Sequence, residues 1–294
     1  MKILICSDGM PAAENAMRLG AAVAAPLKAD VVVLGVAEKA EDESSLQQAL
    51  EKQADALRAQ NVSAKIEMCA GDPVRRIADE TSKTKYDLVI VGARKTGETG
   101  LYWRSQKMYE LIKSMSPPVL VAMGKWTQLK RFLVCTGGKE FIDEAVQLTG
   151  KLAKAVGASV TLLHVMAEPP AIYADLVRLE EDVDRLMASK SELGMNLRAQ
   201  KAVLEKLGVP AEVRIRHGIV VDQVFAEARA QHYDLVVTGS SRARGMLRHY
   251  IMGDLTRTIL NHASCPVLVA RAGSMAAPRS FWRSIRRAFA GEGG

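Results

Sequence analysis

The chain repeats its own sequence, and this repeat constrains the fold more than any other feature. The run KYDLVIVGA at 85–93 is matched by HYDLVVTGS at 232–240, and PVLVA at 118–122 recurs unchanged at 266–270. Similarity at a nearly fixed separation indicates duplicated structural units. The chain is therefore expected to contain two related domains, each ending shortly after its copy of PVLVA.

The boundary between the two domains is expected in the GKWTQLK segment at 124–130. Two domains of ordinary size account for most of the 294 residues, because one domain usually holds about 100–200 residues. The predicted units are a first domain at 1–124, a second domain at 130–271 and a basic tail at 272–294. Additional residues in the second domain lengthen its helical region at 171–207.

Each half alternates short apolar runs with longer amphipathic stretches. The apolar runs are ILIC, VVVLGV, AKIEM, LVIVG and VLVA in the first half, and FLVC, VTLLHV, EVRIR, LVVTG and VLVA in the second. The amphipathic stretches of the first half lie at 10–25, 43–60, 73–84 and 103–115. Parallel strands need crossover connections, and continuous Val/Ile/Leu runs suit strands buried on both faces. The sequence therefore predicts an α/β fold of two tandem five-stranded parallel-sheet sandwiches, Rossmann-like, with helices on both faces.

The composition is that of a globular protein. Hydrophobic residues make up 48% and charged residues 25%, which excludes disordered, collagen-like and disulfide-scaffold chains. The cysteines form no CxxC pair, no signal peptide is recognisable, and no uncharged run approaches the roughly 18 residues of a membrane helix. We therefore expect a cytoplasmic protein. The net charge of +7 is partly concentrated in the tail, so nucleic-acid binding is not expected.

Ligands of open parallel sheets bind beyond the carboxyl ends of the strands, where the crossovers change direction. The segments that follow strands one and four lie at 7–9 and 92–106 in the first half, and at 136–138 and 239–256 in the second. Both long segments are rich in Gly, Ser, Lys and Arg. Their amides and cations can surround an anion in front of a helix N-terminus.

Three motifs carry a resemblance to a known family. They are the opening ILICSDG, the run YDLVVTGS followed by an Arg/Gly loop and Gly253, and the closing HASCPVLVAR. With them, residues 1–271 resemble the universal stress protein family in its tandem form. The resemblance implies an adenine nucleotide alpha hydrolase-like sheet in each domain and a non-enzymatic role in stress response, exercised through protein partners not identified by the sequence. In the family's nucleotide-binding branch, Gly-x-x-Gly, nine residues and Gly-Ser or Gly-Thr accompany an early Asp near the adenosine end; other members bind no ATP.

The first half departs from this nucleotide-binding pattern. It keeps Asp8, Val36 and Gly92, which are its candidate binding residues. Lys95 stands where the second Gly belongs, and Ser-Gln at 105–106 replaces Gly-Ser.

The second half keeps more of the pattern, and the implied cofactor there is ATP or another adenine nucleotide. Gly137 replaces the Asp, Arg242 or Ala243 occupies the second Gly position, and Asp254 replaces the final Ser. A carboxylate roughly 4 Å from a phosphate would oppose it by about 4 kcal/mol at an effective dielectric constant of about 20, unless nearby arginines offset this charge. The candidate binding residues of this half are Thr136, Val165, Gly239, Ser240, Arg242, Gly253 and Asp254.

Each candidate also has a purely structural interpretation. Gly92 and Gly239 can serve as turns that follow buried strands. Asp8 can cap the helix expected to begin near Pro11. The arginines of the second long segment can form a solvated loop instead of a phosphate site; they are Arg242, Arg244 and Arg248.

Catalytic signatures are missing from the sequence. It has no GxSxG, HExxH or GxxxxGK[ST] motif, and its histidines show no ligand spacing. The TGGK run at 136–139 is similar to the SGGxDS phosphate loop of ATP pyrophosphatases but lacks the final Ser. Cys6 and Cys135 end equivalent strands and are interpreted as buried small residues, with oxidant-reactive thiols as the alternative. We therefore predict a non-enzymatic protein; the alternatives are a slow ATPase or nucleotidyl-transfer enzyme, and a nucleotide-free membrane-proximal adaptor.

The tail is a separate amphipathic element. Apolar residues between 279 and 289 fall on one side of a helix and arginines mainly on the other, which is typical of a helix that binds an anionic membrane surface or a partner. The alternative is a helix packed on its own domain. The apolar residues are Phe281, Trp282, Ile285 and Phe289, and the arginines are Arg283, Arg286 and Arg287.

The two copies of PVLVA are expected to form edge strands, whose open backbone groups need a partner. Two halves in one chain can pair as two separate subunits would. A pseudo-dimer within one chain is therefore expected.

Overall fold

A computed structural model describes most of both halves of the chain. The described residues are 1–93, 106–137, 143–166, 183–242, 250–251 and 254–271. None of the described helices is long and apolar enough to cross a membrane.

The first half alternates strands and helices as its apolar runs predict. Its elements are β1 (Lys2–Ser7), α1 (Pro11–Leu27), β2 (Asp30–Ala37), the short 3₁₀ helix η1 (Ala40–Asp42), α2 (Glu43–Arg58), β3 (Ala64–Ala70), α3 (Pro73–Lys83), β4 (Leu88–Gly92), α4 (Gln106–Ser114) and β5 (Val119–Ala122).

The second half repeats this order, and its described residues also include the helix α7 and the short strand β10. Its elements are β6 (Arg131–Cys135), α5 (Asp143–Val156), β7 (Ser159–Met166), α7 (Val183–Ala188), α8 (Glu192–Lys206), β8 (Ala211–His217), α9 (Val220–Gln231), β9 (Leu235–Arg242), β10 (Tyr250–Ile251), α10 (Asp254–His262) and β11 (Val267–Arg271).

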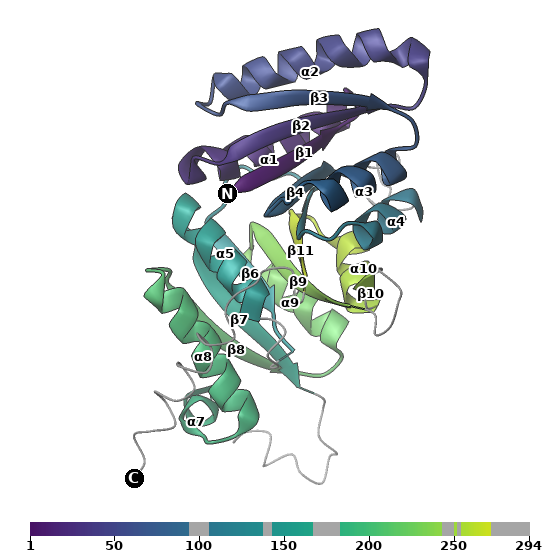
Figure 1. Ribbon diagram of the computed structural model, residues 1–294. Coiled ribbons are helices and arrows are strands. Elements are labelled where there is room, and N and C mark those ends of the chain that lie inside the picture. Colours follow the sequence, from purple (N-terminus) through teal and green to yellow (C-terminus); the bar gives the residue numbers. More distant parts are fainter. Residues whose placement is uncertain (94–105, 138–142, 167–182, 243–249, 252–253, 272–294) are drawn as a thin grey trace.

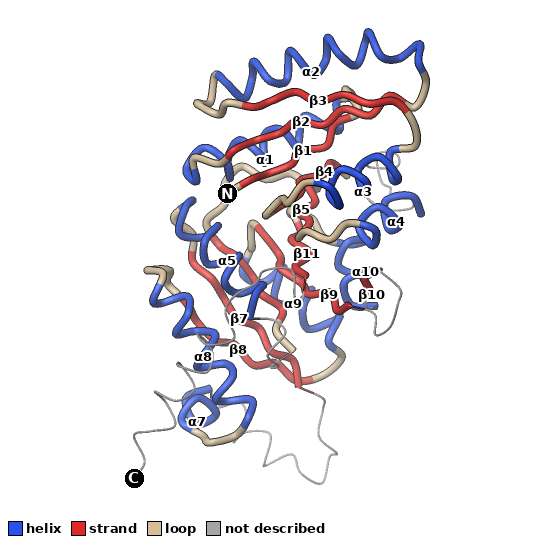
Figure 2. The backbone as a smooth tube through the Cα atoms, in the orientation of Figure 1, coloured by secondary structure: helices blue, strands red, loops and turns tan. Residues whose placement is uncertain are grey.

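The strands form one continuous sheet through the middle of the molecule (Figure 2), in the order β3-β2-β1-β4-β5-β11-β9-β6-β7-β8, with β10 paired to β9. Within each half the strands of this path are parallel. The predicted α/β class is confirmed, and each half contributes five parallel strands as predicted; the two sets join edge to edge in a single sheet. The halves join where β5 and β11 pair antiparallel, with Leu120 opposite Leu268.

Side chains alternate between the two faces of the sheet, and each face is covered by its own set of helices (Figure 1). On β1, Ile3 and Ile5 pack in the layer that contains α1, α2, α5 and α8. Leu4 and Cys6 pack in the opposite layer, with α3, α4, α9 and α10. Both layers are mainly aliphatic, as the low aromatic content of 5% requires.

The segment between the two halves is packed against α1. The Trp126 indole N–H donates to Asn15 Oδ1 at 2.9 Å, and the Arg18 guanidinium lies 4.6 Å from the centre of the Trp126 ring. Arg18 also donates to the Trp126 carbonyl oxygen at 3.2 Å. These contacts fix the path of the chain from β5 to β6.

Candidate functional site

The carboxyl ends of the strands bring the predicted site segments together in each half. β1 pairs with β4 and β6 pairs with β9, both in parallel. The loop at 7–9 therefore lies beside Gly92. Continuing the register of Val134 opposite Val237 places Thr136 beside Gly239.

Thr136 is the best-fixed polar residue at the second-domain strand ends. It is buried, and its hydroxyl donates to Gln200 Oε1 on α8 at 3.1 Å. Its carbonyl oxygen accepts from His164 Nδ1 at 2.9 Å, which places a proton on that ring nitrogen. The backbone N–H of Thr136 donates to the Leu163 carbonyl oxygen at 2.9 Å.

The first domain has the same hydroxyl–glutamine pair. Ser7, which occupies the position of Thr136, donates to Gln53 Oε1 on α2 at 2.7 Å and accepts from the Gly9 N–H at 3.0 Å. Sequence reasoning missed both glutamines. The register of the repeat, which aligns Gln53 with Gln200, was the signal that could have found them.

Two glycines give the second-domain strand ends an open surface. Gly137 and Gly239 are both exposed, and no described atom lies within 4 Å of a Cβ built on either. In the first domain, a Cβ on Gly9 would lie 3.1 Å from Ala49 Cβ and 3.2 Å from Leu46 Cδ1; the equivalent Gly138 lies outside the described residues. The loop after β1 is thus packed on α2, and no described atom crowds Gly137 or Gly239 at the ends of β6 and β9.

Part of the predicted loop at 239–256 is a β-hairpin. β9 continues through Ser240 to Arg242, and β10 returns antiparallel to it, with Tyr250 opposite Arg242 and Ile251 opposite Ser241. The loop prediction is therefore corrected at Ser240 and Arg242, whose backbones belong to a strand because the returning segment pairs with it.

The helix after this hairpin is anchored to the end of β9. α10 begins at Asp254, and the Thr256 hydroxyl donates to the Gly239 carbonyl oxygen at 3.0 Å. Thr256 also lies 2.9 Å from the Thr238 hydroxyl. The position of α10 therefore determines what surrounds Gly239.

A model of the Universal stress protein family matches the chain twice, over residues 1–122 and 128–271. The chain belongs to the universal stress protein family.

Other known proteins are similar to this chain in sequence or in fold. A universal stress protein of Methanocaldococcus jannaschii is 25% identical over 142 residues, which cover 48% of this chain and 82% of that protein. Two tandem-length crystal structures share the fold. A universal stress protein of Archaeoglobus fulgidus superposes with a TM-score of 0.72 at 18% sequence identity. The match covers 92% of this chain and 98% of the Archaeoglobus chain. A putative universal stress protein of Pseudomonas aeruginosa superposes with a TM-score of 0.63 at 16% sequence identity. The match covers 92% of this chain and 93% of the Pseudomonas chain.

The other described candidate residues of this universal stress protein lie at the same edge of the sheet. Val36 is buried at the end of β2, and Val165 is half-buried near the end of β7. Asp8 is exposed and accepts from the Met10 N–H at 3.0 Å, so it closes the turn before α1, which begins at Pro11. Gly253, Lys95 and the tail at 272–294 lie outside the described residues.

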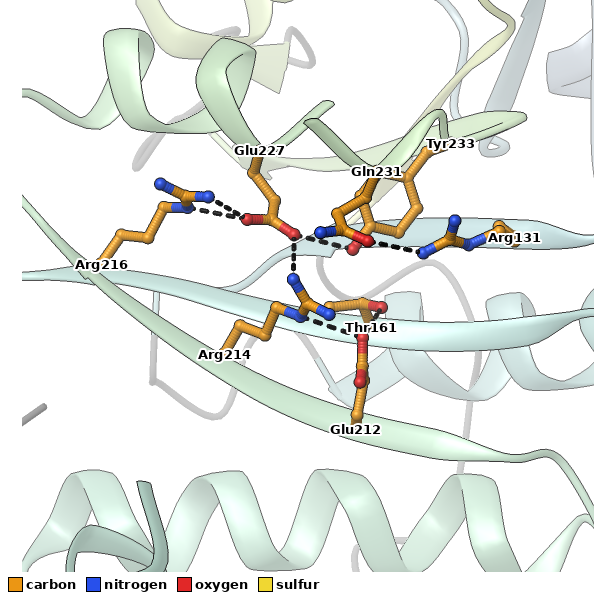
Figure 3. Close-up of polar contacts among 8 residues, drawn as sticks. All are labelled: Arg131, Thr161, Glu212, Arg214, Arg216, Glu227, Gln231 and Tyr233. Atoms are coloured by element: carbon orange, nitrogen blue, oxygen red, sulfur yellow. Dashed lines mark hydrogen bonds and ion pairs between the residues drawn. The ribbon is translucent and has the colours of Figure 1, made fainter. Parts of the chain in front are cut away.

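A second polar cluster lies on the other side of the sheet, between β8 and α9 (Figure 3). The Glu227 carboxylate is fully buried and accepts from Arg214 at 3.0 Å, from Arg216 at 2.7 Å and from the Tyr233 hydroxyl at 3.0 Å. Each carboxylate oxygen has a partner, so the cluster is a structural one. No group of three metal-ligating side chains occurs in the described part of the chain.

The cysteines of this universal stress protein give a first testable prediction. Burial raises the pKa of the Cys6, Cys135 and Cys265 thiols to about 12, so these thiols stay protonated and inert. Cys69 is only partly buried, and desolvation raises its pKa as well. At about pH 8 a soluble disulfide reagent should label Cys69 well before the other three, and should label all of them after denaturation.

A Cys69→Ser variant is the control, and it should lose the early labelling phase. Fast labelling of Cys6 or Cys135 in the native protein would show instead that the strand ends expose their thiols.

Proposed function

We propose that this protein is a non-enzymatic stress-response regulator that binds an adenine nucleotide in its second domain. The ligand lies across the ends of β6 and β9, between Thr136 and Gly239. The observation that carries this proposal is the open space at Gly137 and Gly239, which adjoin a buried and doubly bonded Thr136.

Glycine at both strand ends suits a phosphate ligand. Without a Cβ, the backbone N–H groups can approach phosphate oxygens directly. The N-terminus of α10 lies near Gly239 in space, and a helix N-terminus favours a nearby negative charge. Asp254 at that end carries the opposing charge, which favours weak and reversible binding over tight binding.

The first domain is the weaker candidate for nucleotide binding. Its loop after β1 is packed against α2, and Asp8 holds the turn before α1. We therefore propose that the first domain binds no nucleotide and has a structural role.

Isothermal calorimetry with ATP on matched glycine variants tests the proposal. Gly239→Val places its Cβ where no described atom lies within 4 Å, so the fold should survive while the ligand space is filled. We expect ATP to bind at least about tenfold more weakly, a change of about 1.4 kcal/mol. Gly92→Val, at the equivalent position of the first domain, should change affinity by less than about twofold.

Equal losses from the two variants, or a loss from Gly92→Val alone, would contradict the assignment to the second domain. Assaying the same samples for released phosphate separates the regulator from a slow ATPase. We expect bound ATP to remain intact over the time of the binding measurement.

A further inference from the structure

Besides the β5–β11 pairing, the two domains meet through a pair of equivalent helices. α4 and α10 are both nine residues long and lie next to each other (Figure 1). Tyr109 is the fourth residue of α4, and Arg257 is the fourth residue of α10. These equivalent positions touch: the Arg257 guanidinium lies 5.1 Å from the centre of the Tyr109 ring.

The Tyr109 hydroxyl strengthens this contact with hydrogen bonds. It lies 3.0 Å from the Arg257 carbonyl oxygen and 3.0 Å from Asn261 Oδ1, so it shares its proton between two acceptors on α10. The ring is partly buried in the same apolar layer as Leu255. We call the contacts of Tyr109 with Arg257 and Asn261 the interdomain clasp.

Three second-domain elements that border Gly239 reach α4: α10, β10 and β11. α10 is tied to Gly239 through the hydroxyl of Thr256 and contacts α4 through the interdomain clasp. β10, the return strand of the hairpin, also lies against α4. β11 runs beside β9 with Arg271 opposite Ser240, and the Arg271 side chain donates to the carbonyl oxygens of Ile112 and Pro117 at the end of α4.

We propose that α4 of the first domain positions the ligand site of the second domain, with Tyr109 as the positioning residue. This inference rests on the proposed nucleotide site. Tyr109 does not touch the ligand; it fixes α10, and α10 fixes the carbonyl of Gly239. Binding free energies are reciprocal, so a nucleotide bound in the second domain also strengthens the contact between the domains.

The test compares two tyrosine variants of the full chain. Tyr109→Phe keeps the ring and its stacking with Arg257 but removes the hydroxyl. Tyr86→Phe is the matched control, because the Tyr86 hydroxyl donates to Glu80 at 2.7 Å within the first domain, away from α10. By calorimetry we expect Tyr109→Phe to bind ATP about threefold to tenfold more weakly, and Tyr86→Phe to bind it within about twofold of the original chain.

Hydrogen exchange supplies a readout that needs no ligand. In Tyr109→Phe, the amides of β10 and of α10 should exchange faster than in the original chain. They should be unchanged in Tyr86→Phe. An Asn261→Ala variant completes a double-mutant cycle, in which the two losses of ATP affinity should be less than additive because both remove the same hydrogen bond.

The outcomes separate this inference from the proposed function. If the original chain binds ATP and Tyr109→Phe binds it equally well, the positioning role is wrong and the nucleotide site stands. If the original chain binds no ATP, the proposed function fails. Hydrogen exchange then decides whether α4 positions α10 and β10. Faster exchange in β10 and α10 supports the role of α4, and unchanged exchange overturns it.

Discussion

Replacing Arg271 with alanine is expected to lower the free energy of unfolding by about 4 kcal/mol, as measured by chemical denaturation. Arg271 is 1% exposed, and it is the largest residue by volume among the fully buried side chains of the described chain. It donates to the carbonyl oxygens of Ile112 and Pro117, where the C-terminal end of α4 favours a positive charge. The variant leaves these carbonyl groups without that donor and also opens a cavity.

Arg271→Met is the matched variant, because Met123 fills the equivalent position after β5 and is also fully buried. Methionine restores most of the volume but donates no hydrogen bond, so a loss of about 2 kcal/mol is expected. If Arg271→Met were as stable as the original chain, the cost of burying the guanidinium would match what its hydrogen bonds contribute.

Replacing Glu227 with alanine is expected to lower the free energy of unfolding by about 2–3 kcal/mol, because a buried carboxylate loses its hydrogen bonds while the arginine side chains that it holds are 32% exposed and stay solvated. The carboxylate holds two arginines of the edge strand β8 against α9 (Figure 3). Without it, Arg216 loses the carboxylate that it contacts, and Arg214 keeps its ion pair with Glu212. The Tyr233 hydroxyl loses its acceptor as well, while burial already raises the pKa of this group to about 12.

Glu80→Ala is the control for this prediction. Glu80 is the equivalent residue of the first domain; it is less buried than Glu227, and its carboxylate accepts from Tyr86 at 2.7 Å. We expect a loss of about 1 kcal/mol there. Similar losses from the two variants would show that the arginines of β8 contribute little to stability.

The repeat and the apolar runs predict the strands closely. LVIVG, for example, is β4 from Leu88 to Gly92, because a strand buried on both faces must be apolar throughout. The same runs placed Thr136 and Gly239 at one edge of the sheet, since parallel strands end together.

Arg271 shows why contacts between distant segments could not be predicted from the sequence. A charged residue directly after an apolar run usually marks where a strand leaves the core. Here the guanidinium is buried because the end of α4, more than 150 residues earlier in the chain, supplies carbonyl oxygens. The Tyr109 contacts likewise depend on segments whose proximity is set only by the assembled sheet.

The pairing of α4 with α10 bears on how the two copies can diverge. In an assembly of two identical subunits, the residue at this point of near-symmetry would face its own duplicate, either tyrosine against tyrosine or arginine against arginine. A gene that encodes both copies in one reading frame removes that restriction, because every molecule then carries one α4 and one α10, whose sequences can differ. Tyrosine and arginine can then face each other, and one copy is free to lose a binding site while the other retains it.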